Sequence, residues 1–479
     1  MRAIIMAGGL GTRMSKKFPG VPKCFIELNG KSVLEYQLEQ LYQSQIYDVT
    51  VVINPYAYDY VSNDVGVSDK KRIKGKMANL YPRMNIDFYV EFEFRGTAGS
   101  LFDICKPGAC SYSKVYFDPE ENEDFLLILG DIIFDMKLFR LKEFHECRRL
   151  NVRGEHTATI VTHPSSHIND SDIVLVKKLD DDDDTEVECI IREKQRLLNC
   201  ANLTSAGIYC LNTSIFRDEK IKSRMYNINT AICDTGIKCS IMDILKLTGL
   251  IHVYSYKTSE YIKDTGTPER YNEVLQYIKS GRYNQLLRKA VFLDRDGTIN
   301  DIENGKFVNS VEDLHLYKYA AEAIKIFNSL GYIVVIVTNQ GGINLGYMTE
   351  DKLRDIHNKL EMELAKEGAY VDDILYCPHY GGGCGCRKPN PGLVNRAVGK
   401  HGINIHKSWF IGDSTVDVKT GENANLKTIL LKSGIGGKDH KYDVEPNYKF
   451  KNLLTAAKFI AKLEKKDVYY EPRCSISKN

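Results

Sequence analysis

Residues 289–300 read KAVFLDRDGTIN, and this stretch decides the fold of the second half of the chain. Its apolar segment 289–293 predicts a buried strand, and Asp294, Asp296 and a glycine follow directly. A strand that leads into a polar, glycine-containing turn is typical of the opening of an α/β domain, where functional groups gather at the carboxyl ends of strands. The amino terminus has the same arrangement, because the apolar segment 2–7 leads into a glycine-rich turn at 8–11. The sequence therefore predicts two α/β domains.

Length and strand spacing place the boundary between these domains. A chain of 479 residues suits two or three domains of ordinary size. Four strand-like segments of the second half alternate with helical stretches, as in a parallel doubly wound sheet. They are residues 333–337, 373–376, 409–411 and 428–431. Segment 271–287 is polar and is expected to form a closing helix, so we expect domains at 1–285 and 286–479.

Composition and charge exclude several classes of protein. With 43% hydrophobic and 27% charged residues, the chain has the composition of a globular protein. Its 65 basic and 63 acidic residues give a net charge of +2, which argues against a nucleic-acid binder. No apolar run of the sequence approaches the roughly 18 residues that span a bilayer. Thirteen cysteines, an odd number, indicate a reduced, cytoplasmic protein.

Two conspicuous runs are expected to be structural. The aspartates from Asp180 to Asp184 interrupt a strand-like region, and such like charges are more typical of a solvated hairpin loop than of a metal site. The glycines between Ser433 and Lys438 do not form a phosphate-binding loop, because Lys432 stands where that motif needs its first glycine. We expect a turn after the last strand there.

The glycine-rich turn of the first half has the chemistry of a phosphate site. Gly8, Gly9 and Gly11 have no Cβ atom, so backbone N–H groups in this turn can approach phosphate oxygens closely. Arg13 and Lys23 follow and would supply the positive charge that a triphosphate demands.

The strings GGLGTRM at 8–14 and VPKCFIELNGKSVLEY at 21–36 resemble the signature of the sugar-phosphate nucleotidyltransferases, over most of residues 1–275. The resemblance implies a Rossmann-like domain with a mixed sheet of the GT-A type. It also implies that Asp131 and Asp264 hold Mg²⁺ and that Arg13 and Lys23 contact phosphates. Further matching residues would lie against the nucleotide or the sugar: Gly8, Gly9, Gly11, Thr12, Glu91, Gly96, Thr97, Ala98, Gly99, Gly130, Glu193, Lys194 and Gly207.

Two departures from the family pattern leave the base and the sugar open. Arg95 stands where the family often has an aliphatic residue, and a cysteine-rich insertion occupies roughly residues 106–124. The sequence contains no hexapeptide repeats, which mark the β-helix that many relatives carry after this domain.

The second half combines groups suited to phosphoryl transfer. Asp294 and Asp296 stand at a strand end with the spacing of a nucleophile and a general acid/base. Supporting residues follow in order: Thr338, Lys388, Asp413 and Asp417. This constellation resembles the haloacid dehalogenase superfamily of phosphatases, over about residues 290–435. The role of Asp417 is open between a metal contact and a plain neighbouring carboxylate.

The resemblance to these phosphatases implies a role for each remaining residue. Asp294 would become a phosphoaspartate, and Asp296 would protonate the leaving oxygen and then activate water. Thr338 and Lys388 would bind the transferring phosphoryl group. Asp413 would hold Mg²⁺ together with Asp294 and the backbone carbonyl of Asp296.

A cluster of three cysteines and one histidine suits a structural metal. Cys377, His379, Cys384 and Cys386 lie on a glycine-rich loop, and three thiolates with one imidazole fit tetrahedral Zn²⁺. The loop runs directly into Arg387, so zinc would stiffen the segment that carries the phosphate-binding lysine. Together with LDRDGTIN, this loop resembles the branch of histidinol-phosphate and heptose-bisphosphate phosphatases.

The spacing of the phosphatase residues indicates a member without a cap domain. The intervals from Asp296 to Thr338 and from Thr338 to Lys388 each have room for a helix, a strand and loops, but not for an inserted domain. The substrate would therefore be read by loops, and the expected readers are Asn339, Arg387 and the cysteine loop.

The two resemblances converge on nucleotide-activated heptose synthesis, where such a phosphatase and such a transferase catalyse consecutive steps. They imply removal of the 7-phosphate from D-glycero-D-manno-heptose 1,7-bisphosphate and transfer of a nucleotidyl group to the remaining 1-phosphate. The first half most resembles the heptose-1-phosphate guanylyltransferase branch, which implies GTP as the favoured NTP. The expected partners are thus an NTP and a sugar phosphate, with neither nucleic acid nor membrane, and a homo-oligomer is left open.

Two alternatives stay open at this point. The same chemistries could act on another phosphorylated sugar or polyol and give a CDP- or UDP-activated capsule precursor. Alternatively, the first domain could be a non-catalytic regulatory module beside a phosphatase. Such a module should lose its charged site residues, whereas this chain retains Lys23, Asp131 and Asp264.

Overall fold

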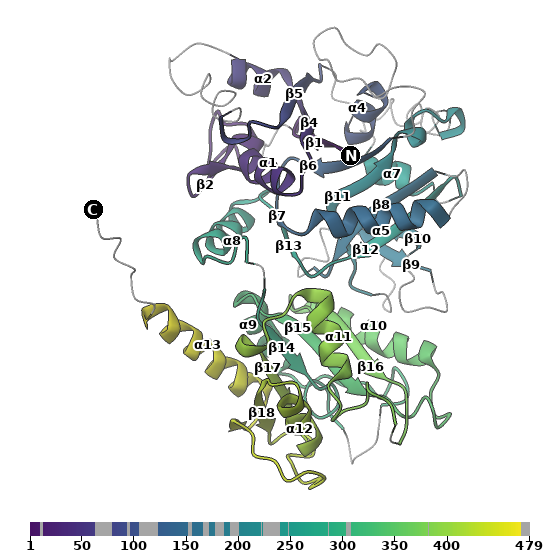
Figure 1. The fold of residues 1–479 in the computed structure, drawn as a ribbon, viewed down its shortest axis with the longest axis vertical. Coiled ribbons are helices and arrows are strands. Elements are labelled where there is room, and N and C mark those ends of the chain that lie inside the picture. Colours follow the sequence, from purple (N-terminus) through teal and green to yellow (C-terminus); the bar gives the residue numbers. More distant parts are fainter. Residues whose placement is uncertain are drawn as a thin grey trace. The chain divides into compact units, whose positions relative to one another are not determined.

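The computed structural model divides the chain into two compact units, which are described separately (Figure 1). The first comprises Met1–Thr162, Val174–Ile191 and Ser205–Gln285, and the second comprises His163–Ile173, Arg192–Thr204 and Leu286–Asn479. The structure describes residues 1–9, 13–62, 79–92, 96–104, 123–151, 156–165, 172–177, 186–191, 201–221, 223, 240–247, 249–285, 287–302, 308–381 and 383–470.

The first unit contains a nine-stranded mixed sheet. Its strand β1 (Arg2–Met6) pairs in parallel with β4 (Asp48–Ile53) and β6 (Asp124–Leu129), and β5 (Asn85–Val90) pairs in parallel with β4. Because β11 (Thr204–Asn212) runs antiparallel to β6, the sheet is mixed, and that prediction is confirmed. The remaining strands are β8 (His156–His163), β9 (Ile173–Val176), β10 (Val187–Ile191) and β12 (Ile251–Lys257).

Helices cover both faces of this sheet, as the alternation of β1 shows. Ala3 and Ile5 pack in one hydrophobic cluster with α1 (Val33–Gln43), whereas Ile4 packs in another with α4 (Gly96–Ile104). Successive side chains of a strand point to opposite faces, so the continuous apolar run of β1 after Arg2 needs cover on both sides. The middle of this strand, Ala3 to Ile5, is therefore fully buried, and its carboxyl end is held in a fixed position.

Smaller elements of the first unit complete the site end of the sheet. The two-stranded sheet of β7 (Ile132–Asp135) and β13 (Tyr261–Asp264) is antiparallel. Helix α8 (Pro268–Lys279) begins where the Thr267 hydroxyl accepts from the backbone N–H of Arg270. The other elements are η1 (Lys23–Phe25), β2 (Glu27–Leu28), β3 (Lys31–Ser32), α2 (Pro55–Ser62), α5 (Leu138–Asn151), η3 (Thr213–Phe216) and α7 (Ile241–Leu245).

The second unit contains a six-stranded, fully parallel sheet in the order β16-β15-β14-β17-β18-β19. In that order the strands are Asp373–Cys377, Ile333–Asn339, Ala290–Leu293, Trp409–Gly412, Lys427–Leu431 and Tyr448–Phe450. The parallel doubly wound arrangement predicted for this half is therefore confirmed. The helices are α9 (Ala320–Ser329), α10 (Glu350–Lys366), α11 (Gly392–His401), η5 (Ile405–Lys407), α12 (Thr415–Asn423) and α13 (Leu453–Tyr470).

Alternating residues of the first strand of this sheet again face two different layers. Val291 and Leu293 of β14 pack with apolar residues of α9, α10 and α13, whereas Ala290 and Phe292 pack with those of α11. Both faces of a parallel sheet are normally covered in this way. Buried on both sides, β14 holds the polar turn that follows it, including Asp294, at the edge of a rigid core.

Three details differ from the sequence-based expectations. The closing helix expected at 271–287 is α8, which ends at Lys279 because Gly281 adopts a φ of +71° just beyond it. The loop after β18 is a turn, but it does not follow the last strand, since β19 comes later. Neither β19 nor the long helix α13 was predicted; β19 has only three residues, which carry too little periodicity to be recognised.

The described part of the second unit contains no inserted cap domain. Between Asp296 and Thr338 it has α9 and most of β15, and between Thr338 and Lys388 it has α10 and β16. Among the described helices, none combines the length and apolar character needed to cross a bilayer.

Candidate active sites

The first unit has a cavity at the carboxyl ends of β1 and β6. It has a volume of about 160 Å³ and is lined by Met6, Ala7, Gly8, Gly9, Lys23, Cys24, Glu91, Gly96, Thr97, Leu129, Gly130 and Asp131. Residues from five separate segments of the sequence thus meet at one sheet edge. Eight of these lining residues were expected to bind substrate, metal or phosphate. A concave site with a few polar groups on an apolar floor suits a small ligand.

Two glycines of this cavity are needed for close packing. The backbone N–H of Gly130 donates to Met6 O at 2.9 Å, and a Cβ on residue 130 would lie 2.8 Å from the Cα of Ala7. A Cβ on Gly8 would lie 3.1 Å from Oε2 of Glu91. The Glu91 carboxylate is buried and accepts from the Ser100 hydroxyl at 2.7 Å. These glycines therefore keep the cavity open between two strand ends and a fixed carboxylate.

Lys23, Asp131 and Asp264 come together beside this cavity. The Lys23 ammonium forms an ion pair with Asp131 Oδ2. A Cβ on Gly266 would lie 2.7 Å from Asp264 Oδ1, 3.3 Å from Lys23 Nζ and 3.8 Å from Asp131 Oδ2, so all three charged groups surround that glycine. Pairing of Asp264 with Ile132 in the β7–β13 sheet brings the two carboxylates to the same end. Two carboxylates so arranged suit a hard divalent cation.

Asp264 is held by a residue that sequence reasoning did not assign to the site. Arg270 Nη1 lies 3.2 Å from both carboxylate oxygens of Asp264, and the backbone N–H of Gly266 donates to Oδ1 at 2.9 Å. Arg270 lies in the first turn of α8, six positions after Asp264. The only available signal was the position of this arginine inside the DTGTPERY string.

The other predicted residues of the first unit are placed differently. Arg13 is exposed and does not line the cavity. The Thr97 hydroxyl accepts from the backbone N–H of Ile241, and Ala98 and Gly99 continue α4. A Cβ on Gly207 would lie 2.3 Å from Ile132 Cδ1, which makes Gly207 a packing glycine. Several predicted features lie outside the described residues: Gly11, Thr12, Arg95, most of the cysteine-rich insertion, Asp180 to Asp184, Glu193 and Lys194.

In the second unit a buried lysine connects two aspartates. Lys388 Nζ lies 2.7 Å from Asp294 Oδ1 and 2.7 Å from Asp417 Oδ1. The side chains of Lys388 and Asp417 are only 4% and 1% exposed. The other oxygen of Asp417 accepts from the backbone N–H and the hydroxyl of Ser414 at the start of α12. Asp417 thus orients the lysine and caps a helix.

Asp413 adds a third carboxylate to this buried group. One ligand atom from each of Asp294, Asp413 and Asp417 lies within 4.8 Å of the others. Burial raises the pKa of Asp294 to about 7, against the lowering effect of Lys388. Burial and the neighbouring carboxylates raise the pKa of Asp413 to about 8. Three carboxylates beside one lysine repel one another, as the raised pKa values of Asp294 and Asp413 show, and a divalent cation would relieve this repulsion.

Asp296 lies beside this group with several donors on its carboxylate. Arg295 Nη2 lies 2.9 Å from Oδ2 and Arg295 Nε lies 3.2 Å from Oδ1. Asn300 donates to Oδ1 at 3.1 Å, and Gln340 donates to Oδ2 at 3.2 Å. Gln340 also donates to the Thr338 hydroxyl at 2.7 Å, which links Asp296 to the end of β15.

Arg295 is fully buried, and the residue that contacts its guanidinium could not be recognised in the sequence. Its Nη1 lies 3.2 Å from Nε2 of His357 on α10. Burial, together with the Arg295 charge, holds the pKa of His357 well below its usual value, so the imidazole is neutral and accepts from the guanidinium. Gln340, Asn300 and His357 are therefore site residues that sequence reasoning missed.

The predicted substrate readers lie next to the buried lysine. Asn339 accepts from the backbone N–H of Lys388 at 3.0 Å and donates to its carbonyl at 3.2 Å. Arg387 Nη1 donates to the backbone carbonyl of His379 at 2.6 Å. Asn339 thus fixes the backbone of the lysine segment, and Arg387 ties this segment to the cysteine loop.

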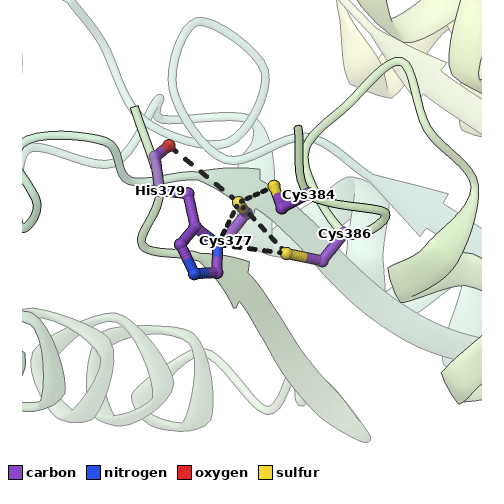
Figure 2. Close-up of side chains that lie close together, drawn as sticks. All are labelled: Cys377, His379, Cys384 and Cys386. Carbon is purple, nitrogen blue, oxygen red and sulfur yellow. Dashed lines mark hydrogen bonds between the residues drawn. The ribbon is translucent and has the colours of Figure 1, made fainter. Parts of the chain in front are cut away.

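The four groups of the cysteine loop converge on one point (Figure 2). Sγ of Cys377 lies 3.6 Å from Sγ of Cys384 and 3.3 Å from Sγ of Cys386. Nδ1 of His379 lies 3.5 Å from the Cys377 sulfur and 3.4 Å from the Cys386 sulfur. A tetrahedral ion with Zn–S bonds of about 2.3 Å would separate its ligands by roughly 3.8 Å. The donor set and its spacing therefore fit a four-coordinate metal.

Comparison with known families assigns both halves. The profile of the Nucleotidyl transferase family matches residues 2–281, and that of the HAD-hydrolase-like family matches residues 385–456. The first match covers more than half of the chain.

Two relatives and one solved structure are similar to parts of this chain. The D-glycero-beta-D-manno-heptose-1,7-bisphosphate 7-phosphatase of Pasteurella multocida is 37% identical over 156 residues, which cover 31% of this chain and 84% of that protein. The corresponding alpha-anomer phosphatase of Photorhabdus laumondii is 36% identical over 155 residues, with 30% and 84% covered. HddC from Yersinia pseudotuberculosis, complexed with GMP-PN, is 20% identical with a TM-score of 0.40, over 58% of this chain and 99% of that one.

The chain therefore belongs to the nucleotidyl transferase family and also to the HAD-like hydrolases that include the heptose-bisphosphate phosphatases, and it is a bifunctional enzyme.

Proposed function

We propose that this enzyme acts twice on one sugar: it removes the 7-phosphate of D-glycero-D-manno-heptose 1,7-bisphosphate and then transfers a nucleotidyl group to the 1-phosphate. The observation that carries the proposal is the buried group of Asp294, Lys388 and Asp413 in a chain that is 37% identical to a heptose-bisphosphate 7-phosphatase. The first unit supports the second step, because its cavity holds Lys23 and Asp131 beside a glycine-rich strand end.

In the phosphatase step, Asp294 is the nucleophile. Its carboxylate oxygen forms a bond to the phosphorus of the 7-phosphate while the bond from phosphorus to O7 breaks. Lys388 offers positive charge to the transferring phosphoryl group, and Asp296 delivers the proton that the leaving O7 needs. Asp296 then takes a proton from water as that water attacks the phosphoaspartate, which releases phosphate and restores Asp294.

Two metals complete the second unit in this proposal. Asp294, Asp413 and the backbone carbonyl of Asp296 would hold Mg²⁺, which supplies charge neutralisation for the phosphoryl oxygens. The cysteine loop would hold Zn²⁺ in a structural role, since all four donors are used and no coordination position remains for chemistry. Arg387 then ties that loop to the segment that carries the lysine.

In the transferase step, an oxygen of the sugar 1-phosphate forms a bond to the α-phosphorus of the NTP, and the bond from this phosphorus to pyrophosphate breaks. Lys23 and Arg13 bind phosphate oxygens, and Gly8, Gly9 and Gly130 let the nucleotide approach the strand ends. Asp131 and Asp264 would hold Mg²⁺, which neutralises charge on the leaving pyrophosphate. Lys23 must exchange its Asp131 partner for phosphate when substrate enters.

We further propose GTP as the favoured donor and the cytoplasm as the location. The cytoplasmic assignment is supported by the cysteines of the described part of the chain, which are all free. The choice of GTP is supported by the resemblance of the first half to the heptose-1-phosphate guanylyltransferase branch.

The test is a substrate panel assayed with two separate readouts. Purified enzyme with Mg²⁺ receives either anomer of heptose 1,7-bisphosphate, or polyol and hexose bisphosphates, with each of the four NTPs in turn. Orthophosphate release reports the second unit, and pyrophosphate release reports the first. Preference for heptose with GTP supports the proposal. Preference for a polyol phosphate with CTP or UTP would show that heptose is not the substrate. Phosphate release without pyrophosphate release from any NTP would indicate that the first unit is not catalytic.

A further inference from the structure

The glycine-rich turn that follows β18 is not used by the chemistry described above, yet it contacts the metal-binding carboxylate directly. We call residues 433–437 the glycine loop. The backbone N–H of Ile435 donates to Asp413 Oδ2 at 2.6 Å, and the backbone N–H of Gly437 donates to the Asp413 carbonyl at 2.7 Å. Asp413 is 1% exposed. The loop therefore holds both the side chain and the main chain of this aspartate.

Glycine is required at the closest point of approach. Gly434 has a φ of +55°, and a Cβ on it would lie 2.2 Å from Asp413 Oδ2. From the opposite strand end, Gly297 has a φ of +81°, and a Cβ on it would lie 2.3 Å from the same oxygen. The Asp413 carboxylate thus lies between two glycines whose backbone conformations disfavour any other residue.

The segment after the glycine loop is anchored to α12, the helix that begins just after Asp413. The backbone N–H of Thr415 donates to Asp439 Oδ1 at 2.9 Å, and its hydroxyl donates to Oδ2 at 2.5 Å. The Thr415 hydroxyl in turn accepts from the backbone N–H groups of Lys441 and Tyr442. These bonds fix the far end of the loop against the helix that carries Asp417.

We propose that the glycine loop is a positioning element that sets the orientation of the Asp413 carboxylate for divalent-cation binding; this inference rests on the proposed phosphatase function. A carboxylate offers about four lone-pair positions, so the bond from Ile435 leaves the others available. A buried carboxylate without this bond could rotate away from Asp294. Partners that orient a metal ligand contribute strongly to metal affinity. Ile435 acts through its backbone amide, and therefore its side chain is free to vary.

The test compares Gly434→Ala with a matched control, Gly346→Ala. Gly346 also has a positive φ, of +76°, but a Cβ there would meet no atom within 4 Å. The control therefore carries the backbone strain without the contact to Asp413. Mg²⁺ binding to the full chain is measured by calorimetry in an Asp131→Asn and Asp264→Asn background, so that neither transferase carboxylate contributes. We expect about tenfold weaker Mg²⁺ binding for Gly434→Ala and no change for the control.

Two further readouts separate positioning from loss of structure. The Mg²⁺ concentration for half-maximal phosphatase activity should rise by about the same factor, with a much smaller change in kcat at saturating Mg²⁺. If Gly434→Ala loses the melting transition of the second unit, Asp439→Ala serves as the test variant, because it releases only the anchor. We expect Asp439→Ala to weaken Mg²⁺ binding by about threefold or more, which is the size of effect expected from the loss of one hydrogen bond.

The outcomes distinguish this inference from the proposed function. A folded Gly434→Ala, or in its absence Asp439→Ala, that binds Mg²⁺ as tightly as the parent would overturn the inference while leaving the phosphatase intact. Weakened Mg²⁺ binding in a protein that releases no phosphate from heptose 1,7-bisphosphate would support the inference and reject the proposed substrate.

Discussion

The two candidate sites of this enzyme differ in how deeply their charged side chains are buried. In the second unit, Lys388 and Asp417 are 4% and 1% exposed, and the lysine lies between two carboxylates. In the first unit, Lys23 and Asp131 are 22% and 24% exposed, and Asp264 is paired with Arg270 instead. Both sites stand at the carboxyl ends of parallel strands, but one is buried and the other is open.

The difference follows from the size of the group that each site must bind. A phosphoryl group that is attacked by an aspartate needs a small, rigid pocket in which charge is fixed before substrate enters. A triphosphate and a sugar phosphate bring several negative charges of their own, and an open site can leave part of its charge to be balanced by the substrates. We therefore expect substitutions in the second site to lower activity mainly by disturbing the charges within the site. Substitutions in the first site should lower activity mainly by removing contacts to the substrates.

The largest expected effect is that of Asp294→Asn, which removes the proposed nucleophile. Orthophosphate release should fall by at least about 10³-fold. Pyrophosphate release from heptose 1-phosphate and GTP should stay at the parent level, because Asp294 lies in the other unit. The two products are assayed on the same preparation. Loss of both activities would show that the two sites are not independent and would contradict the distinction drawn between them.

Lys23→Ala is expected to have the opposite effect, with loss of transferase activity and unchanged phosphatase activity. Pyrophosphate release should fall by about 10²- to 10³-fold, the usual size of losing one charged group aimed at a transition state. Phosphate release should not change. Lys31→Ala is the matched control, since Lys31 is 44% exposed, pairs with Glu39 and does not line the cavity. A Lys23→Ala enzyme that keeps full transferase activity would contradict the role given to this lysine.

Metal removal from the cysteine loop should destabilise one unit only. A zinc chelator, or Cys384→Ser, should lower the Tm of the second unit by at least about 5 °C, because the four donors would lose the ion that we propose holds the loop. The Tm of the first unit should not move. Cys147→Ser, at an exposed free cysteine, is the control. Calorimetry resolves the two transitions, and an unchanged second transition would reject the structural metal.

The smallest expected effect is a pH dependence carried by His357. Its pKa is lowered well below 6.5 by burial and by Arg295, so the folded protein binds its proton less readily than the unfolded chain does. The stability that this neutral imidazole contributes is therefore present above about pH 6.5 and is lost as the pH falls toward the folded-state pKa.

His357→Gln tests that dependence. Glutamine keeps an acceptor for Arg295 but does not titrate, so the loss of stability of the second unit between about pH 6.5 and pH 5 should become shallower. Each unit of pKa difference corresponds to about 1.4 kcal/mol. The exposed His406→Gln variant should keep the parent profile. Denaturant unfolding at several pH values gives the measurement, and identical profiles for His357→Gln and the parent would refute the assignment.

The sequence could predict the site residues that follow directly after a strand or a recognisable motif. It could not predict the residues that hydrogen-bond to those site residues from elsewhere in the chain. Asp294 and Asp413 follow buried strands, and Lys388 follows a recognisable cysteine loop, so their meeting at one sheet edge was predictable. The parallel sheet of the second unit was also predictable from its strand-and-helix alternation, whereas the mixed sheet of the first was implied only by the family resemblance.

The supporting residues could not be predicted, because their contacts join distant segments. His357 touches Arg295 from the middle of α10, and Gln340 joins Asp296 to Thr338, with no local pattern to mark either contact. Asp417 was ambiguous in the sequence, and its pairing with Lys388 depends on how α12 packs. The glycine loop was read as a turn, and its contact with Asp413 appears only once β17 and β18 lie side by side.

The most direct test of the account is a phosphorus NMR time course on the parent enzyme with Mg²⁺, heptose 1,7-bisphosphate and GTP. The account predicts that the 7-phosphate resonance disappears into orthophosphate first, and that pyrophosphate and a sugar-linked diphosphate follow. Pyrophosphate that forms while the 7-phosphate persists, or no orthophosphate at all, would contradict it.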